Sequence, residues 1–369
     1  MLFEQYQYDV FRFPTPQYLG AKWFIADWIA KFIPNSVKRA IDGFAGSQSI
    51  AFLFKQRGIE VLTNDFLSFN HQIGLALIEN RHEKLSKSDI ELLLCENTSA
   101  GTLMQELFAG VFFEEHDACV LDAFRANVEE LDSLYKKALA LAVMNRSLTR
   151  KVTMGHFAHH KALAYASNPI RVKRDPSIAR PIAEIFKSLV PEYNNAVFDN
   201  GKNNRSSNAK ILDWLPSIDD ADLIYLDPPY TDSHADYQAF YHLLETFTRY
   251  WRDKDFINRT KRYFPPLWSG FDKKTEVMDS FIRLFEMAKS IPNWLISFND
   301  RSYPSVDVLR QLIARYKEVQ VEVKPYVSSR GGKGSVAGSH EVLFVCRNKL
   351  AITINDSVNQ LCPQNPLED

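Results

Sequence analysis

The sequence is poor in several features that mark whole classes of protein. Its four cysteines, Cys95, Cys119, Cys346 and Cys362, lie far apart without metal-ligand spacing, which favours free cytosolic thiols over a disulfide framework. It has no run of 18 apolar residues, so no membrane-spanning helix is predicted. The start, MLFEQYQYDVFRFPTPQ, lacks the basic segment and apolar stretch of a secretory signal. We therefore expect a cytoplasmic protein.

An excess of charge of one sign is also missing. The 44 basic and 45 acidic residues nearly cancel, so the overall charge predicts no polyanionic partner, and only local clusters bear on that question. The chain is 46% apolar and 24% charged, which is typical of a soluble globular enzyme with material for a sizeable core. Internal repeats and long low-complexity segments are absent as well.

A strand–turn–helix–strand pattern is present in residues 39–65. RAIDGFAG reads as a short buried strand entering a glycine-containing turn, SIAFLFKQRG as a helix ending at Gly58, and IEVLTND as a second strand. A unit of about 27 residues with this order predicts two parallel strands of a Rossmann-type sheet. Upstream, residues 22–33 have apolar positions at helical spacing and stop at Pro34.

The rest of the chain suggests a divided domain. Residues 67–144 are mostly helical in pattern, and 122–144 form the clearest long amphipathic stretch. We expect a discontinuous catalytic domain of residues 1–66 and 209–348, interrupted by an insertion at 67–208. A helical insertion at 231–292 and a tail at 349–369 complete the predicted organisation.

The stretch ADLIYLDPPYTD, residues 221–232, joins an apolar strand to a carboxylate, two prolines and an aromatic ring. Ligands of an open parallel sheet bind outside the carboxyl ends of its strands, which places Asp227 at a ligand crevice. Pro228 and Pro229 fix the backbone and have no amide hydrogen. The Asp227 carboxylate and the Pro228 carbonyl are then free to accept hydrogen bonds from an outside amine, and Tyr230 offers a flat face beside them.

A planar exocyclic amine, such as N6 of adenine, fits two acceptors and an aromatic face. Its lone pair is delocalised, but two acceptors that hold the amino hydrogens draw the nitrogen toward a tetrahedral geometry for in-line attack on a methyl group. A sulfonium donor needs neither a metal nor a strong base, because it leaves as a neutral thioether. The alternative is that these four residues form only a rigid turn; the preceding apolar strand and the upstream glycine turn favour the functional interpretation.

In the order of its motifs the chain resembles the Dam-like DNA adenine-N6 methyltransferases, in which the donor motif precedes DPPY. The resemblance rests on YLGAKWFIADWIAKFIP, IDGFAGSQSIAFLFKQRGIEVLTND, LTRKVTMGHF, DPPY, WLISFND and VSSRGGKGSVAGSHEVLFV, which span roughly residues 15–348. It implies an α/β fold with the Rossmann-like sheet of the class I methyltransferases and S-adenosylmethionine (AdoMet) as donor. It also implies that residues 67–208 are a mainly helical target-recognition domain that binds DNA.

The resemblance implies roles for individual residues as well. The expected donor contacts are Tyr18, Lys22, Asp42, Phe44, Ala45, Gly46, Asp65 and Asp227. The expected catalytic residues are Asp227, Pro228, Pro229 and Tyr230. Asp65, an acid about 20 positions beyond the glycine turn, would accept from the ribose hydroxyls. Asp227 would serve both the methionine end of the donor and the target amine, and Tyr230 would stack on the target base.

The glycine-containing turn, which resembles the AdoMet loop of the family, departs from the family pattern at one position. The family commonly has a second glycine two positions after Gly46, where this chain has Gln48, and we expect its side chain to narrow the loop. The polar residue that often touches the adenine ring of the donor should precede AKILDWLPS, which makes Asn208 the candidate.

Basic residues without acidic neighbours gather at residues 145–174, with seven Lys/Arg and no Asp/Glu. A base in a duplex must leave the stack to react, and basic side chains hold the phosphates. LTRKVTMGHF is similar to the basic hairpin that contacts DNA in the family. The candidate DNA contacts are Arg150, Lys151, Lys161, Lys173 and Arg174, with Arg330 and Lys333 in the loop 329–334. The alternatives are a solvated basic surface and, for the loop, a plain hairpin turn.

Two other clusters admit more than one interpretation. His156, His159 and His160 lack a cysteine or carboxylate among them, so we predict no metal site. The basic, proline-containing stretch NRTKRYFPP at 258–266 is either a lid or DNA-facing loop, or a structural insertion.

Other functions stay open from the sequence. They are an RNA adenine or guanine methyltransferase, a cytosine-N4 methyltransferase (in which serine more often replaces the aspartate) and a catalytically inactive DNA-binding relative. The length and place of residues 67–208 favour DNA. We expect a monomeric, site-specific enzyme that acts on double-stranded DNA in the nucleoid, as part of a restriction–modification system whose endonuclease is a separate protein.

Overall fold

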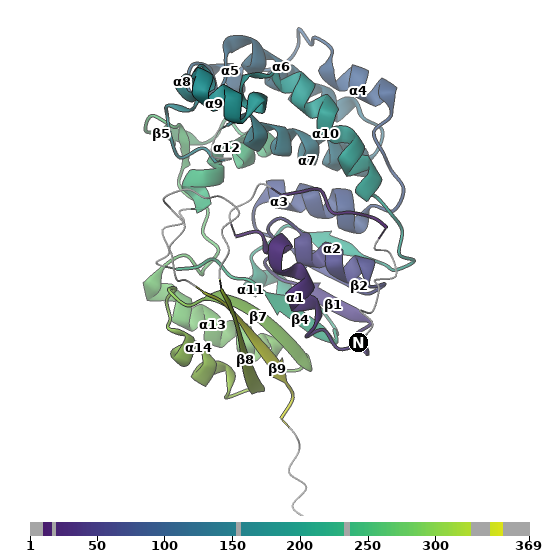
Figure 1. Ribbon diagram of the computed structural model, residues 1–369, viewed down its shortest axis with the longest axis vertical. Coiled ribbons are helices and arrows are strands. Elements are labelled where there is room, and N and C mark those ends of the chain that lie inside the picture. The colour runs from purple at the N-terminus through teal and green to yellow at the C-terminus, as the bar shows by residue number, and fades with distance from the viewer. Residues whose placement is uncertain (1–9, 17–19, 153–155, 232–236, 326–339, 350–369) are drawn as a thin grey trace, which may run out of the picture.

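A seven-stranded sheet forms the lower half of the molecule in the computed structural model, which describes residues 10–16, 20–152, 156–231, 237–325 and 340–349 (Figure 1). Its strands are β1 (Arg39–Asp42), β2 (Glu60–Asn64), β3 (Arg205–Ser207), β4 (Leu223–Leu226), β7 (Asn293–Asn299), β8 (Glu318–Pro325) and β9 (His340–Arg347). Their order is β3-β2-β1-β4-β7-β9-β8, and only β9 runs against its neighbours. The predicted α/β fold with a mostly parallel sheet is confirmed.

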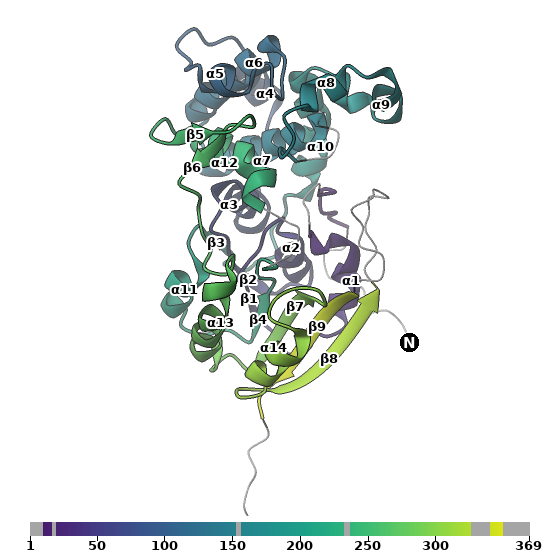
Figure 2. The same ribbon diagram turned by 90° about the vertical axis from the view of Figure 1, so that its left-hand side faces the viewer.

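Helices cover both faces of this sheet because its inner strands are apolar on both sides. In β4, Leu223 and Tyr225 join one core, and Ile224 and Leu226 join the other, which explains the unbroken apolar run of the sequence. The first face is covered by η1 (Lys22–Ile25), α1 (Ala26–Ala30) and α2 (Ser49–Gln56). The second is covered by α11 (Ile211–Trp214), η5 (Leu215–Ser217), α13 (Lys274–Ala288) and α14 (Val306–Ile313) (Figure 2).

A helical layer lies above the sheet and contains most of the chain between β2 and β3. Its elements are α4 (Lys87–Leu94), α5 (Leu103–Phe108), α6 (Glu115–Asn127), η3 (Val128–Glu130), α7 (Leu134–Lys151), α8 (Ala162–Ala166), α9 (Pro169–Arg174), η4 (Pro176–Ala179) and α10 (Ile182–Ala196). Two consecutive helices, α3 (Ser68–Ile73) and η2 (Gly74–Glu79), connect it to β2 and pack against α7. The layer therefore rests directly on the end of β2.

The long amphipathic stretch at 122–144 is two helices rather than one. The first, α6, ends at Asn127, and α7 begins after Ser133, whose hydroxyl accepts from the backbone N–H groups of Tyr135 and Lys136. A serine cap satisfies amide groups that have no partner inside the helix, so it starts a new helix where the apolar periodicity continues.

The structure divides two of the predicted insertions. Arg205–Ser207 form β3 and pair with β2, so the last residues of the predicted insertion 67–208 belong to the sheet. In the predicted insertion 231–292, α12 (Tyr237–Arg249) packs on α3 and α7 in the helical layer, whereas α13 covers the sheet. Between them lies a hairpin of β5 (Asp255–Ile257) and β6 (Arg262–Phe264).

Candidate active site

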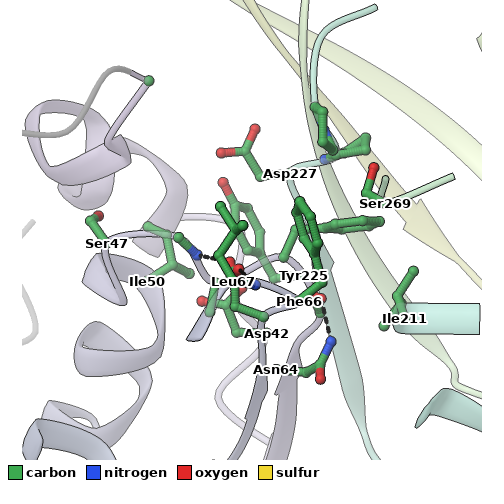
Figure 3. A pocket seen from close by; sticks show the side chains of 18 of the residues that line it. Asp42, Ser47, Ile50, Asn64, Phe66, Leu67, Ile211, Tyr225, Asp227 and Ser269 are labelled. Atoms are coloured by element: carbon green, nitrogen blue, oxygen red, sulfur yellow. Dashed lines mark hydrogen bonds between the residues drawn. The ribbon is translucent and has the colours of Figure 1, made fainter. Parts of the chain in front are cut away.

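A cavity of about 840 Å³, counting its open mouth, lies at the carboxyl ends of β1, β2 and β4 (Figure 3). Asp42 ends β1, Asp65 follows β2, and Asp227 follows β4, and all three line the cavity. The sequence places these acids up to 185 positions apart (227 − 42), and parallel pairing brings them to one edge of the sheet. A cavity outside the carboxyl ends of parallel strands lies where such sheets usually bind their ligands.

Asp42 fixes the start of α2 and keeps one oxygen unused. Its Oδ2 accepts from the backbone N–H of Ala51 at 3.0 Å, in the first turn of α2. Its Oδ1 is buried and has no hydrogen-bond partner among the described residues. Burial and the nearby Asp227 raise the pKa of the Asp42 carboxyl well above its ordinary value. An unsatisfied buried acceptor at a cavity wall is suited to a ligand that donates a hydrogen bond.

The glycine turn positions three of the predicted donor contacts. Phe44, Ala45 and Gly46 line the cavity, and Gly46 has φ = 46°, a left-handed conformation that favours glycine. The backbone N–H of Ala45 donates to the Asn64 carbonyl at 3.0 Å, which joins the turn to the end of β2.

The expectation that Gln48 narrows this loop is wrong. Gln48 is fully buried in a left-handed conformation, and its side chain points into the interior. Its Oε1 accepts from the Thr63 hydroxyl at 2.6 Å, and its Nε2 donates to the Asn70 carbonyl at 3.3 Å. Ser47 and Ser49 line the cavity, but Gln48 does not. The neighbouring Gly74 leaves the necessary room, because a Cβ there would lie 3.1 Å from the Gln48 amide nitrogen.

Asp65 ties the glycine turn to the segment after β2. Its Oδ2 accepts from the Gly46 N–H and its Oδ1 from the Leu67 N–H, both at 2.8 Å. Burial raises the pKa of this carboxyl to about 6, although these two hydrogen bonds oppose the shift. Each carboxylate oxygen has a second lone pair, so the donor role expected for Asp65 is compatible with its present hydrogen bonds.

The raised pKa of Asp65 predicts a pH-dependent stability. The folded protein holds this proton to about pH 6, whereas the unfolded chain releases it near the ordinary value of about 3.9. Stability should therefore fall as pH rises through this window, by about 3 kcal/mol from this group alone. Urea unfolding of wild type and Asp65→Asn from pH 4 to 7 measures the effect: the variant should gain relative stability with pH. A pH-independent difference between the two proteins would contradict the assignment.

Asp227 is held by an ion pair and a hydroxyl. The Lys22 ammonium lies 2.9 Å from its Oδ2, and the Tyr230 hydroxyl donates to its Oδ1 at 2.9 Å. The Lys22 side chain is 4% exposed and that of Asp227 18% exposed. Burial raises the pKa of the Asp227 carboxyl, while Lys22 and Tyr230 act in the opposite direction. Pro228 and Pro229 line the cavity beside it.

Sequence reasoning missed one wall of the cavity. Ser269 and Asp272, from the segment after the β5–β6 hairpin, also line it (Figure 3 labels Ser269). The Ser269 hydroxyl and backbone N–H both donate to Asp272 Oδ2 at 2.6 Å. The neighbouring Phe271 packs edge-on against Phe44, with ring centroids 5.0 Å apart. No motif marks this segment; the Phe44 contact, a hydrogen bond from the Thr231 hydroxyl to the Phe271 carbonyl and the packing of α13 on the sheet bring it to the site.

Two predicted site residues have other contacts. Asn208 does not line the cavity. Its side-chain Nδ2 donates to the Asp65 carbonyl at 2.8 Å, and its Oδ1 accepts from Arg249 at 3.3 Å. Asn208 therefore supports, from outside the cavity, residues 65–67, which line it and which we call the donor segment. Lys151 is wrong as a DNA contact: it is 7% exposed and its ammonium lies 2.8 Å from Asp117 Oδ2.

Four of the other candidate DNA contacts lie among the described residues. Arg150 is exposed at the end of α7, Lys161 precedes α8, and Lys173 and Arg174 end α9, all exposed. Tyr18, Arg330 and Lys333 lie outside the described residues. The expected basic hairpin at 148–157 is wrong for the part described, because residues up to Lys151 continue α7.

A basic hairpin does exist, at β5–β6. It exposes Arg259 at its turn and Ile257 and Phe264 on its strands. Its sequence signal is the stretch 258–266, for which the sequence allows a lid or DNA-facing loop, or a structural insertion.

The described ranges contain neither a metal-binding cluster nor a membrane-spanning helix. No group of three or more His, Cys, Asp or Glu side chains there could hold a metal ion. No helix in the same ranges is long and apolar enough to cross a membrane.

Comparison with known proteins identifies the family to which this site belongs. Residues 18–312 match the sequence model described as D12 class N6 adenine-specific DNA methyltransferase. Type II methyltransferase M2.HphI of Haemophilus parahaemolyticus is 31% identical over 351 residues, covering 92% of this chain and 99% of that protein. Type II methyltransferase M.FokI of Planomicrobium okeanokoites is 23% identical over 356 residues, covering 91% of this chain and 53% of that protein. The chain therefore belongs to the D12 class N6 adenine-specific DNA methyltransferase family.

Proposed function

We propose that the protein methylates N6 of a flipped-out adenine at a specific site in double-stranded DNA, with AdoMet as donor. We also propose that it is the modification enzyme of a restriction–modification system. The observation that carries the proposal is the position of Asp227. Its carboxylate follows β4, directly before two prolines, and opens onto a cavity that it shares with Asp42 and Asp65.

The residues around the cavity fit a cationic donor with hydroxyl groups. The cavity lining contains the carboxyls of Asp42, Asp65, Asp227 and Asp272 but only two ammonium groups, those of Lys22 and Lys210, and burial raises the pKa of all four carboxyls. The orphan Oδ1 of Asp42 needs a hydrogen-bond donor. Bound AdoMet would supply an activated methyl group on a sulfonium. Asp65 would hold the hydroxyls of its ribose, and Phe44 would pack against it.

The chain itself would orient the target amine. The Asp227 carboxylate and the Pro228 carbonyl would accept its two hydrogens, since neither proline has an N–H group that would compete. Lys22 favours the ionised carboxylate, and the Tyr230 hydroxyl fixes one of its oxygens. These groups are oriented before the substrate arrives, which is the condition for strong electrostatic stabilisation of a transition state.

The proposed DNA face lies on the side of the molecule that Figure 2 presents. In that view the β5–β6 hairpin and the α8–α9 segment lie on opposite sides of α12. The hairpin exposes Arg259, and α9 exposes Lys173 and Arg174. The apolar Ile257 and Phe264 of the hairpin suit contact with unstacked bases, while the basic residues suit phosphates.

Exposed and buried basic residues of this region should respond differently to substitution. The triple variant Arg150→Ala, Lys173→Ala, Arg174→Ala should bind DNA more weakly and reduce the slope of log K against log[salt] by roughly 2–3, at about 0.9 per lost phosphate contact. Arg283→Ala, an exposed site on α13, which covers the sheet, is the matched control. Binding titrations at several salt concentrations measure the slope, and an unchanged slope would count against this footprint.

Lys151→Met should instead lower stability by about 3–5 kcal/mol, because it leaves Asp117 buried without its cation. Urea unfolding measures this effect. A stable Lys151→Met protein with weakened DNA binding would reverse our assignment of this lysine.

Labelled methyl transfer from AdoMet, followed by nucleoside analysis, tests the proposed function. Duplex DNA should yield N6-methyladenine within one short sequence, and DNA carrying it should resist an endonuclease encoded nearby. Label found only in structured RNA would overturn the substrate, and modification at unrelated sequences would overturn site specificity.

A further inference from the structure

The helix α12 has an unusually polar buried face. Its side chains His242, Glu245 and Thr246 are fully buried, and Thr248 nearly so. Burial of such groups is costly unless each is hydrogen-bonded, so their partners indicate what the helix must hold in place. The helix begins shortly after the catalytic motif and leads into the β5–β6 hairpin, so it joins two elements of the proposed reaction site.

One set of partners ties α12 to the helical layer. The Asn145 amide on α7 donates to the Thr248 hydroxyl at 2.9 Å, and Arg125 on α6 donates to the Thr248 carbonyl at 3.3 Å. Near the start of α12, the Phe157 N–H donates to the Phe240 carbonyl at 2.8 Å. A displacement of the helical layer would therefore carry α12 with it.

A second set ties α12 to the donor segment. Glu245, which is 0% exposed, accepts from the backbone N–H groups of Ser68 at 3.1 Å and Phe69 at 3.2 Å, the first two residues of α3. Its ion pair with Arg249 is 2.5 Å long. The Arg249 guanidinium donates to the side-chain Oδ1 of Asn208 at 3.3 Å, and the Asn208 side-chain Nδ2 donates to the backbone carbonyl of Asp65 at 2.8 Å.

These two contacts hold the donor segment at both ends. Asp65, Phe66 and Leu67 line the cavity, Asn208 holds the first of them, and Glu245 holds the α3 terminus that follows the last. The residue at the N-cap of α3, Leu67, has no side chain that could cap it. Glu245 supplies the missing acceptors from another part of the chain, so the position of the segment depends on α12.

We infer that Glu245, Arg249 and Asn208 are positioning residues that couple DNA binding by the helical layer to donor binding in the cavity. The inference rests on the proposed function. Coupling of this kind is reciprocal: if DNA tightens the donor, then the donor tightens DNA by the same factor. A typical coupling is roughly 5- to 150-fold.

Titration calorimetry with sinefungin, an unreactive AdoMet analogue, tests the inference with the full chain. The dissociation constant is measured alone and with saturating duplex that contains the methylated sequence. Wild type should show at least about 5-fold coupling, and Arg249→Gln and Asn208→Ala should bring the factor close to 1. Both positions are partly exposed, so neither variant removes a core side chain.

Arg252→Ala is the matched control. Arg252 is an exposed arginine three positions beyond Arg249 that contacts Glu106 rather than the donor segment, so its coupling should equal that of wild type. Glu245→Gln, which keeps the side-chain shape, should also lose coupling, and urea unfolding monitors its folding. Coupling that persists in the Arg249 and Asn208 variants, or is absent from wild type, would overturn the inference alone. A wild type that binds no sinefungin or no DNA would overturn the proposed function as well.

Discussion

Replacing Asp227 with alanine should nearly abolish methyl transfer while donor binding survives in part. The carboxylate is one of two proposed acceptors for the target amine, and loss of one prearranged polar group of a transition-state site lowers kcat by about 100- to 1000-fold. Asp227→Asn keeps one acceptor oxygen but loses the ion pair with Lys22, so its activity should fall between that of wild type and that of Asp227→Ala. Single-turnover transfer measures the effect, and calorimetry with AdoMet measures donor binding.

A loss of turnover in Asp227→Ala reports on catalysis only when the variant is folded. Asp227→Ala leaves the buried Lys22 ammonium without its carboxylate, so urea unfolding should accompany the kinetics. A folded Asp227→Ala protein with full turnover would refute the catalytic role. Loss of donor binding in parallel with turnover would show that Asp227 acts on the donor alone.

Replacing Lys22 with methionine should shift the acid limb of the pH–rate profile upward. Burial already raises the pKa of the Asp227 carboxyl, and Lys22 is the largest influence that lowers it. Without the ammonium, the proton stays on Asp227 to a higher pH, and a protonated carboxyl is a poorer acceptor. We expect a shift of at least about one unit, which corresponds to a tenfold loss of kcat on the acid side.

The charge of Lys22 can be separated from its shape. Lys22→Arg retains the positive charge and should keep the acid limb near that of wild type. At alkaline pH the methionine variant should recover most of its kcat, since Asp227 is then ionised in both proteins. An acid limb that does not move in Lys22→Met would contradict the proposed role of this ion pair.

The parts of the site that are predictable from sequence are encoded in short stretches. DLIYLDPPY contains a strand that is apolar on both faces and the acid that follows it, so the place of Asp227 at the sheet edge needs no distant information. The same holds for the glycine turn and Asp65, because one strand–turn–helix–strand unit contains both. The order of strands in a parallel sheet then brings the two stretches together.

The parts that sequence reasoning missed depend on contacts between distant residues. Lys151 lies in a basic segment, yet its partner Asp117 is on another helix and no spacing reveals the pair. Gln48 fills a position where glycine is common, because Thr63 and Asn70 compensate the left-handed backbone from neighbouring elements. Glu245 likewise caps a helix 176–177 positions away in the chain.

The structure of a ternary complex with sinefungin and duplex DNA tests the central claim most directly. The account predicts that the target adenine lies outside the helix, with its N6 within about 3.2 Å of an Asp227 carboxylate oxygen and of the Pro228 carbonyl. The donor analogue should fill the cavity against Asp42 and Asp65. An adenine still stacked in the duplex, or an N6 held by other groups, would contradict the account.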